Sequence, residues 1–314
     1  MVNAVWLCPG QGAQKVGMGK DLADRFPVAR QTFQAVDDAL GMALSKIMFE
    51  GPEDQLTDTE NAQPAILAHS AAVFAVVREK VAHPVAAAGH SLGEYSAYLT
   101  AGALSAAEAA KLVRRRGALM QQAGDARPGT MAAVLGLATA DVQEACRQAS
   151  QANSVVVAAN LNAPDQTVIS GDPDAVDRAG GLCRAKGAKR VLPLKVSGAF
   201  HSPLMAPAAD KLRLALDKAP FAAPRIPVIA NATAEAVKDP ARARRLLADQ
   251  LTAPVRWVAC MEKTATLGEG GTPPAYVEIG PGTVLAGLVK RIVPGVTVTS
   301  LGTADEVTKF LETA

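Results

Sequence analysis

The sequence contains few of the residues that mark nucleic-acid-binding proteins. Aromatic side chains make up 4% of its 314 residues, and the formal net charge is only +2. Single-stranded and double-stranded nucleic acids are bound by basic surfaces, often interleaved with aromatic residues. No such stripe is present, and the short basic runs fall inside helical patterns that favour solvated helix faces. We therefore expect no nucleic acid among the partners.

Cysteines and long apolar runs are scarce as well. The four cysteines, Cys8, Cys146, Cys183 and Cys260, are too far apart for CxxC chemistry, so we expect buried, reduced thiols and no metal site. The longest uncharged run, residues 61–77, contains Asn, Gln, Pro, His and Ser and is a poor membrane span. The N-terminus lacks the basic region of a signal peptide. These features predict a cytoplasmic protein without a membrane partner, and we expect a monomer.

Short apolar runs alternate with helical patterns along most of the chain, which is typical of an α/β fold with a mostly parallel sheet. Residues 2–8 and 85–90 are predicted to be buried strands, and residues 92–101 the helix after the second strand. Residues 64–80 are predicted to form a helix with Pro64 in its first turn. In the last third, strands are expected at 227–230, 275–279 and 296–300, and helices at 240–252, 255–267 and 282–292.

Residues 130–196 follow a different order. The pattern reads strand, helix, strand, strand, helix, strand, which is the order of a ferredoxin-like unit. Gly, Asp and Pro cluster before it, at residues 124–129, as at a domain boundary. We therefore predict a small ferredoxin-like subdomain at 128–196, inserted into a large, hydrolase-like α/β subdomain formed by 1–127 and 197–314.

The segment from Gly89 to Gly93 matches the pattern G-x-S-x-G at the junction of a predicted strand and a predicted helix. A nucleophile elbow needs small residues on both sides of its serine, because the serine occupies a tight, strained turn. In that setting Ser91 is a candidate nucleophile, and the amide of Leu92 is a candidate oxyanion donor. The pattern alone is also met by ordinary glycine-flanked turns.

A serine nucleophile needs a base, and the chain has only four histidines. His69 lies inside an apolar helical pattern and is interpreted as a packed structural residue. His83 precedes a proline and is interpreted as a surface residue. His90 adjoins Ser91 on the strand, so its side chain points to the opposite side. His201, in a glycine-containing loop after a predicted strand, remains as the candidate base.

Arg116 is the most informative residue for the substrate. The helix that contains it begins at Ser105, which stands in capping-box spacing with Glu108. At about 100° per residue, Arg116 falls in the centre of the apolar stripe of this helix. A buried arginine must be paired, because an unpaired buried charge is very costly. Arg116 therefore either forms an internal ion pair or binds a substrate carboxylate through the two-pronged guanidinium group. The second function would select a dicarboxylic acyl group.

The turn after the first strand contains two glycines, at positions 10 and 12. In an α/β sheet, ligands gather at the carboxyl ends of the strands. The amide of Gln11 is therefore a candidate second oxyanion donor, although the same spacing also fits a plain tight turn.

Taken together, these segments resemble the malonyl-CoA:acyl carrier protein transacylases of fatty-acid synthesis and the related acyltransferase domains of polyketide synthases. The similar stretches occur in the family's order over nearly the whole chain: residues 9–14 (PGQGAQ), 59–67 (TENAQPAIL), 89–94 (GHSLGE), 116–121 (RGALMQ), 198–202 (GAFHS), 250–257 (QLTAPVRW) and 278–282 (EIGPG).

The resemblance implies transfer of a malonyl group from malonyl-CoA to the phosphopantetheine thiol of an acyl carrier protein through a malonyl ester of Ser91. It implies that a backbone carbonyl at Gln250 orients His201, that Arg116 binds the substrate carboxylate, and that Gln11 and Leu92 form the oxyanion hole. It places Gln63 and Phe200 among the substrate-binding residues. Leu92 and Phe200 match the malonyl-selective rather than the methylmalonyl-selective pattern. No cofactor is implied, since the CoA thioester is a substrate.

Other functions remain open at this level. A serine thioesterase or esterase would use the same elbow, base and oxyanion hole. An acyltransferase serving a polyketide synthase, or the transacylase component of a malonate decarboxylase, would share the reaction as well. A non-catalytic carrier-binding scaffold is disfavoured by the presence of Ser91, His201 and Arg116 together.

Overall fold

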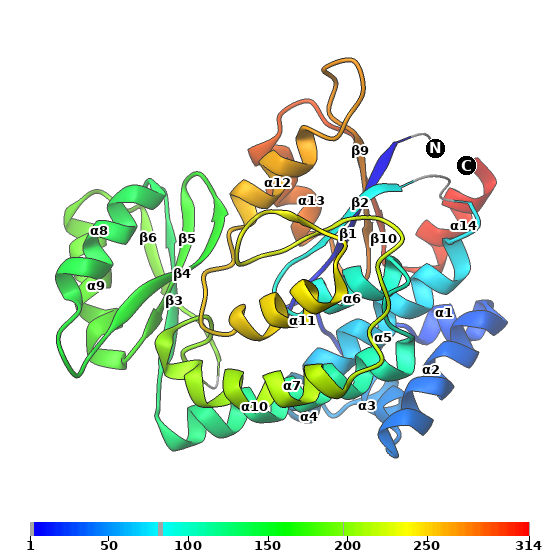
Figure 1. Cartoon of the computed structure of the whole chain (residues 1–314), viewed down its shortest axis with the longest axis horizontal. Helices are drawn as coiled ribbons and strands as arrows, with labels where there is room; N and C mark the ends of the chain where they lie inside the picture. Colours follow the sequence, from blue (N-terminus) through cyan, green and yellow to red (C-terminus); the bar gives the residue numbers. More distant parts are fainter. Residues whose placement is uncertain (1–2, 81–83, 197, 314) are drawn as a thin grey trace.

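The computed structural model of the chain describes residues 3–80, 84–196 and 198–313 (Figure 1). Its larger sheet has six strands in the order β10-β9-β1-β2-β7-β8, and all neighbours are parallel except β7 and β8. The bounds of these strands are β1 Ala4–Cys8, β2 Pro84–Gly89, β7 Val228–Ile229, β8 Ala236–Val237, β9 Ala275–Ile279 and β10 Val298–Leu301. This is the mostly parallel sheet that the sequence predicts.

Helices cover both faces of this sheet. Successive side chains of each strand point to opposite faces, so neighbouring residues of one strand pack against different helices. Trp6 and Cys8 of β1 point into a large core shared with α2, α5, α6 and α7, while Val5 and Leu7 pack against α12 and α13. The helices of this subdomain are α1 Lys20–Arg25, α2 Pro27–Leu40, α3 Leu44–Glu50, α4 Glu53–Thr57, α5 Thr59–Val77, α6 Gly93–Thr100, α7 Ala106–Ala126, η1 Pro203–Met205, α10 Ala206–Lys218, α11 Pro240–Asp249, α12 Trp257–Ala265, α13 Val284–Ile292 and α14 Ala304–Thr313.

The smaller sheet is antiparallel and lies to one side of the large subdomain, drawn in green in Figure 1. Its strand order, β4-β5-β3-β6, is that of a ferredoxin-like unit, and helices α8 and α9 share its core. The elements are β3 Thr130–Leu135, α8 Thr139–Ala149, β4 Val156–Ala163, β5 Gln166–Gly171, α9 Pro173–Ala185 and β6 Arg190–Pro193. The predicted fold class is therefore confirmed.

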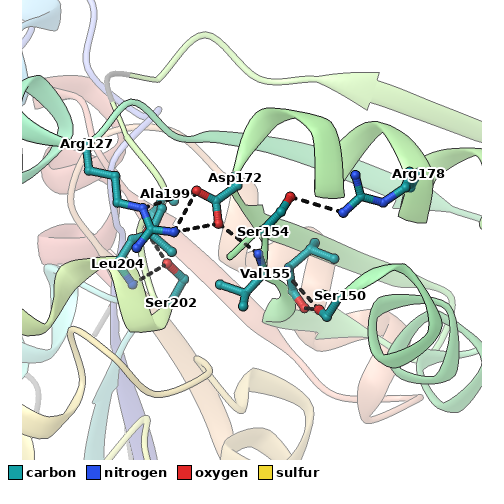
Figure 2. A network of polar contacts seen from close by, with 10 residues as sticks. Arg127, Ser150, Ser154, Val155, Asp172, Arg178, Ala199, Ser202 and Leu204 are labelled. Atoms are coloured by element: carbon teal, nitrogen blue, oxygen red, sulfur yellow. Dashed lines mark hydrogen bonds and ion pairs between the residues drawn. The ribbon is translucent and has the colours of Figure 1, made fainter. Parts of the chain in front are cut away.

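An exposed polar network ties the end of α7 to the small subdomain (Figure 2). The Arg127 guanidinium donates to both carboxylate oxygens of Asp172, with Nη2 2.9 Å from each. Asp172 Oδ2 also accepts from the backbone N–H of Val155 at 2.8 Å. The Asp172 carboxylate, in the connection between β5 and α9, thus joins the end of α7 to the connection between α8 and β4.

The prediction that Pro64 lies in the first turn of its helix is wrong. Helix α5 begins at Thr59, and Pro64 lies inside it. A proline inside a helix leaves the carbonyl four residues earlier without its usual donor. Here Nη1 of Arg114, from α7, donates to that carbonyl, Glu60 O, at 3.0 Å, and Arg114 also pairs with the Glu60 carboxylate. A contact from another helix therefore compensates for the proline.

Three sequence predictions touch residues outside the described part of the chain: Val2 in the first strand, His83 as a surface residue, and residue 197 at the start of the returning large subdomain. Among described residues, the four cysteines are buried and free, as expected.

Replacing Arg114 by alanine should lower the free energy of unfolding by about 1–2 kcal/mol, because a half-buried carbonyl and a carboxylate lose their donor. Arg115→Ala removes the same side chain from an exposed position of the same helix and should change stability by less than about 0.5 kcal/mol. Urea unfolding of both variants measures the difference. Equal losses would show that the contact with Glu60 O does not compensate for Pro64.

Candidate active site

Ser91 lies in a sharp turn between the end of β2 and the first turn of α6. Its φ is 53°, a left-handed backbone conformation that residues other than glycine rarely adopt. The flanking glycines make this turn sterically possible. A Cβ at Gly89 would lie 1.9 Å from the carbonyl oxygen of Gly93, and one at Gly93 would lie 2.1 Å from that of Cys8. The geometry is that of a nucleophile elbow.

His201 faces the serine directly. Its Nε2 is 2.7 Å from Ser91 Oγ, and its Nδ1 is 2.9 Å from the backbone oxygen of Gln250. A carbonyl oxygen can only accept, so Nδ1 carries the proton and Nε2 accepts the hydroxyl proton of Ser91. This places the imidazole in the tautomer that a general base needs, with a backbone carbonyl where other serine enzymes have a carboxylate.

The surroundings of His201 keep its imidazole neutral. Burial, and secondarily the positive charge of Arg116, lower the pKa of His201 to about 3. The imidazole therefore stays neutral throughout the physiological pH range, which is the form that a general base requires.

Arg116 lies beside the nucleophile and is 1% exposed. Its Nη2 donates to Ser91 Oγ at 3.0 Å and to Gln250 Oε1 at 2.9 Å, while Nη1 donates to Gln63 Oε1 at 2.7 Å. All three partners are neutral, and within the described residues no carboxylate forms an ion pair with this guanidinium. The internal ion pair considered from the sequence is thus not what the structure shows. A cation held by neutral groups next to the nucleophile is suited to meet an anionic substrate.

Two residues of the site were missed by sequence reasoning. Asn231, which follows β7, accepts from the N–H of Ser91 through Oδ1 at 2.7 Å and donates to Gly89 O through Nδ2 at 2.7 Å. Glu94, in α6, is fully buried and accepts from the N–H of Asn231 and from the side chain of Gln250. Glu94 belongs to a stretch on which the family resemblance rests, but its burial behind the elbow had no signal in the sequence.

The two predicted oxyanion donors border the elbow. Leu92 is the N-terminal cap of α6, and Gln11 follows β1, the strand next to β2. In the described part of the chain, the backbone N–H groups of Gln11 and Leu92 donate to no protein acceptor. Both amides thus remain available to a ligand, and their oxyanion role stays a prediction.

The remaining candidates divide clearly. His69 is buried in α5, as expected for a packed histidine. His90 turns away from the base position, with Nε2 2.8 Å from Asn162 Oδ1 and its ring against Trp257. Phe200 is 5% exposed and belongs to the large core. Its place in substrate binding stays a prediction.

Residues 3–80, 84–196 and 198–313 contain neither a metal-binding cluster nor a membrane-spanning helix. No group of three or more His, Cys, Asp or Glu side chains there is arranged to hold a metal ion. No helix in those ranges is long and apolar enough to cross a membrane.

The elbow, base and buried arginine define a serine acyltransferase site, and the sequence agrees with that class. Residues 5–313 match the family described as "Acyl transferase domain", so the chain belongs to this family.

The malonyl CoA-acyl carrier protein transacylase of Bacillus subtilis is 44% identical over 292 residues, covering 93% of this chain and 91% of the relative. The acyl carrier protein S-malonyltransferase of Vibrio cholerae superposes with a TM-score of 0.92 at 43% identity, covering 98% and 99% of the two chains. A malonyl-transacylase in complex with its type II PKS acyl-carrier protein gives 0.93 at 41% identity, covering 99% and 100%. The predicted relationship to malonyl-CoA:acyl carrier protein transacylases is confirmed.

The depressed pKa of His201 predicts an unusual pH profile. Single-turnover acylation of Ser91 should stay nearly constant from about pH 7 down to about pH 5, where a histidine with an ordinary pKa would already be protonated. Rapid-quench measurements with malonyl-CoA test this. His201→Ala, which should fold normally, is the control and should lose about 10³-fold or more in acylation rate. A fall in the wild-type rate with a midpoint near 6.5 would contradict a buried, neutral His201.

Proposed function

We propose that this protein moves a malonyl group from malonyl-CoA to the phosphopantetheine thiol of an acyl carrier protein in fatty-acid synthesis, with Ser91 as nucleophile and His201 as base. The observation that carries this proposal is the position of the Arg116 guanidinium, 3.0 Å from the Ser91 hydroxyl. Family membership and the named relatives support the reaction, and the site geometry supports the roles of the residues.

In the first half-reaction, Ser91 Oγ attacks the thioester carbonyl of malonyl-CoA while His201 Nε2 takes the hydroxyl proton. The backbone amides of Gln11 and Leu92 stabilise the negative charge that develops on the carbonyl oxygen. The bond between carbon and sulfur then breaks, and His201 returns the proton to the departing CoA thiolate. The malonyl group remains as an ester on Ser91.

In the second half-reaction, the thiol of the carrier protein takes the place of CoA. His201 accepts the thiol proton, the sulfur attacks the ester carbonyl, and Ser91 leaves with the proton that His201 returns. The chain needs no cofactor for this exchange, because the thioester substrate supplies the activated acyl group.

Arg116 distinguishes this function from that of a serine esterase or thioesterase. A hydrolase acting on neutral acyl groups has no use for a buried cation next to its nucleophile, which is costly to desolvate. The malonyl carboxylate supplies the missing anion, with Gln63 and Gln250 fixing the guanidinium plane. Leu92 and Phe200 shape the site for malonyl rather than methylmalonyl groups, a selectivity worth roughly 1–3 kcal/mol.

In this proposal, residues 1–127 and 197–314 form the catalytic subdomain and residues 128–196 form the small subdomain. We propose that the protein is a cytoplasmic monomer. Its partners there are malonyl-CoA and the acyl carrier protein.

Intact-protein mass spectrometry tests the proposed function. Brief mixing with malonyl-CoA should add one malonyl group to the wild type and none to Ser91→Ala, and holo acyl carrier protein should then remove it. Rapid release of free malonate without transfer to the carrier would instead identify a hydrolase.

Arg116→Ala should lose most malonyl transfer, by about 10²-fold or more, because a charge-assisted bidentate contact to the carboxylate disappears. The same variant should retain or gain acylation by acetyl-CoA, which has no carboxylate. Single-turnover rates with the two thioesters measure the difference. An equal loss on both would refute the carboxylate-binding role.

A further inference from the structure

Glu94 is a fully buried carboxylate that the mechanism above does not use. It lies in the first turn of α6, three residues after the nucleophile. Its Oε2 accepts two hydrogen bonds, from the backbone N–H of Asn231 at 3.0 Å and from Nε2 of Gln250 at 2.7 Å. Within the described residues, its Oε1 is buried without a partner. The carboxylate thus makes its hydrogen bonds to two residues that themselves touch the reacting groups.

Gln250 connects Glu94 to Arg116. Its side-chain Nε2 donates to Glu94 Oε2 and to Ser91 O, while its Oε1 accepts from Nη2 of Arg116. A carboxylate only accepts and a guanidinium only donates, so the two together fix which end of the amide faces each of them. With the acceptor at Glu94 removed, the side chain would lose one of the contacts that hold its oxygen toward Arg116.

Asn231 connects Glu94 to the elbow. Its backbone N–H is held by Glu94, and its side chain bridges Gly89 O and the N–H of Ser91 across the strained turn. A left-handed backbone at Ser91 persists only when the surrounding structure holds it. The carboxylate of Glu94 therefore supports the elbow from behind as well as the arginine at its side.

Glu94 also lies near enough to Arg116 for the charge of the guanidinium to affect its titration. Burial raises the pKa of Glu94 to about 7, while the hydrogen bonds from Asn231 and Gln250, and after them the positive charge of Arg116, oppose that rise. The two groups are joined through the Gln250 amide rather than by direct contact.

We propose that Glu94 is a positioning residue for malonyl transfer, whose carboxylate holds Gln250 and Asn231 so that Arg116 and the Ser91 elbow keep the geometry that the malonyl group requires. This inference rests on the proposed function. It adds that malonyl selectivity depends on a residue that touches neither the substrate nor the reacting atoms.

Three substitutions separate geometry from charge. Glu94→Gln keeps an acceptor oxygen at the same reach and removes the charge. Glu94→Asp keeps the charge and withdraws the acceptor by one methylene group, and Glu94→Ala removes it altogether. The readout is the ratio of single-turnover acylation rates with malonyl-CoA and acetyl-CoA, because only the malonyl group uses Arg116.

The ratio should stay within about threefold of wild type in Glu94→Gln and fall by about tenfold or more in Glu94→Asp and Glu94→Ala, since misplacing a reacting group by about 1 Å costs up to 10²-fold. The absolute acylation rates with malonyl-CoA and with acetyl-CoA should fall as well, because the turn at Ser91 loses part of its support. An unchanged ratio in Glu94→Asp and Glu94→Ala overturns the proposal. A ratio that falls in Glu94→Gln but stays near wild type in Glu94→Asp also overturns it, because that result would mean that the charge of Glu94 and not the position of its acceptor oxygen matters.

Glu278 supplies the matched control. It is a second fully buried glutamate, and it accepts from the backbone N–H groups of Leu285 and Ala286 at the start of α13. Glu278→Ala should lower the thermal unfolding midpoint much as Glu94→Ala does, while leaving the malonyl-to-acetyl ratio unchanged. A ratio that falls equally in both variants would show a merely structural effect. Absence of any malonyl adduct on the wild type would refute the proposed function itself, an outcome distinct from a change in the ratio.

Discussion

The site is organised around a buried positive charge. Arg116 reaches the interior from the long helix α7 and makes its hydrogen bonds to neutral groups only. Removing such a charge from water is expensive, and amide and hydroxyl partners repay only part of that cost. Burial, and secondarily this positive charge, lower the pKa of His201. Within the described residues the guanidinium has no direct counter-ion. In the proposed function a substrate carboxylate supplies that counter-ion, so the same positive charge would help both to keep His201 neutral and to select the acyl group.

Gln250 shows how closely the parts of the site depend on one another. Its backbone oxygen orients His201, its side-chain oxygen meets Arg116, and its side-chain nitrogen reaches Ser91 O and Glu94. The segment that follows Gln250 also touches the small subdomain, because Val255 exchanges backbone hydrogen bonds with β4. His90, next to the nucleophile, bonds to Asn162 at the end of the same strand. The small subdomain is therefore connected both to the elbow and to the segment that orients the base.

Much of this arrangement was readable from local pattern. The strand–turn–helix setting of Ser91 predicted the elbow, and helical periodicity from Ser105 placed Arg116 on the buried face. The alternation of strands and helices predicted the ferredoxin-like unit and the mostly parallel sheet. Where local rules failed, a tertiary contact was responsible. Pro64 was expected near a helix start, yet Arg114 from another helix supplies the donor that lets α5 begin at Thr59. Asn231 and Glu94 carried no local signal, since a turn asparagine and a helical glutamate are ordinary residues in sequence.

The sequence by itself predicted the elbow at Ser91 and the burial of Arg116, because each depends on a spacing of a few residues along one strand, turn or helix, and it left His201 as the candidate base by elimination among four histidines. The family resemblance added the backbone carbonyl of Gln250 as the partner of His201. Only the tertiary structure decided how these groups meet: the 2.7 Å contact of His201 with Ser91, the neutral partners of Arg116, and the pair Glu94 and Asn231 behind the elbow. These contacts join residues 25 to 137 positions apart. Their distances are fixed by the packing of distant elements of the large subdomain against one another, which no local pattern encodes.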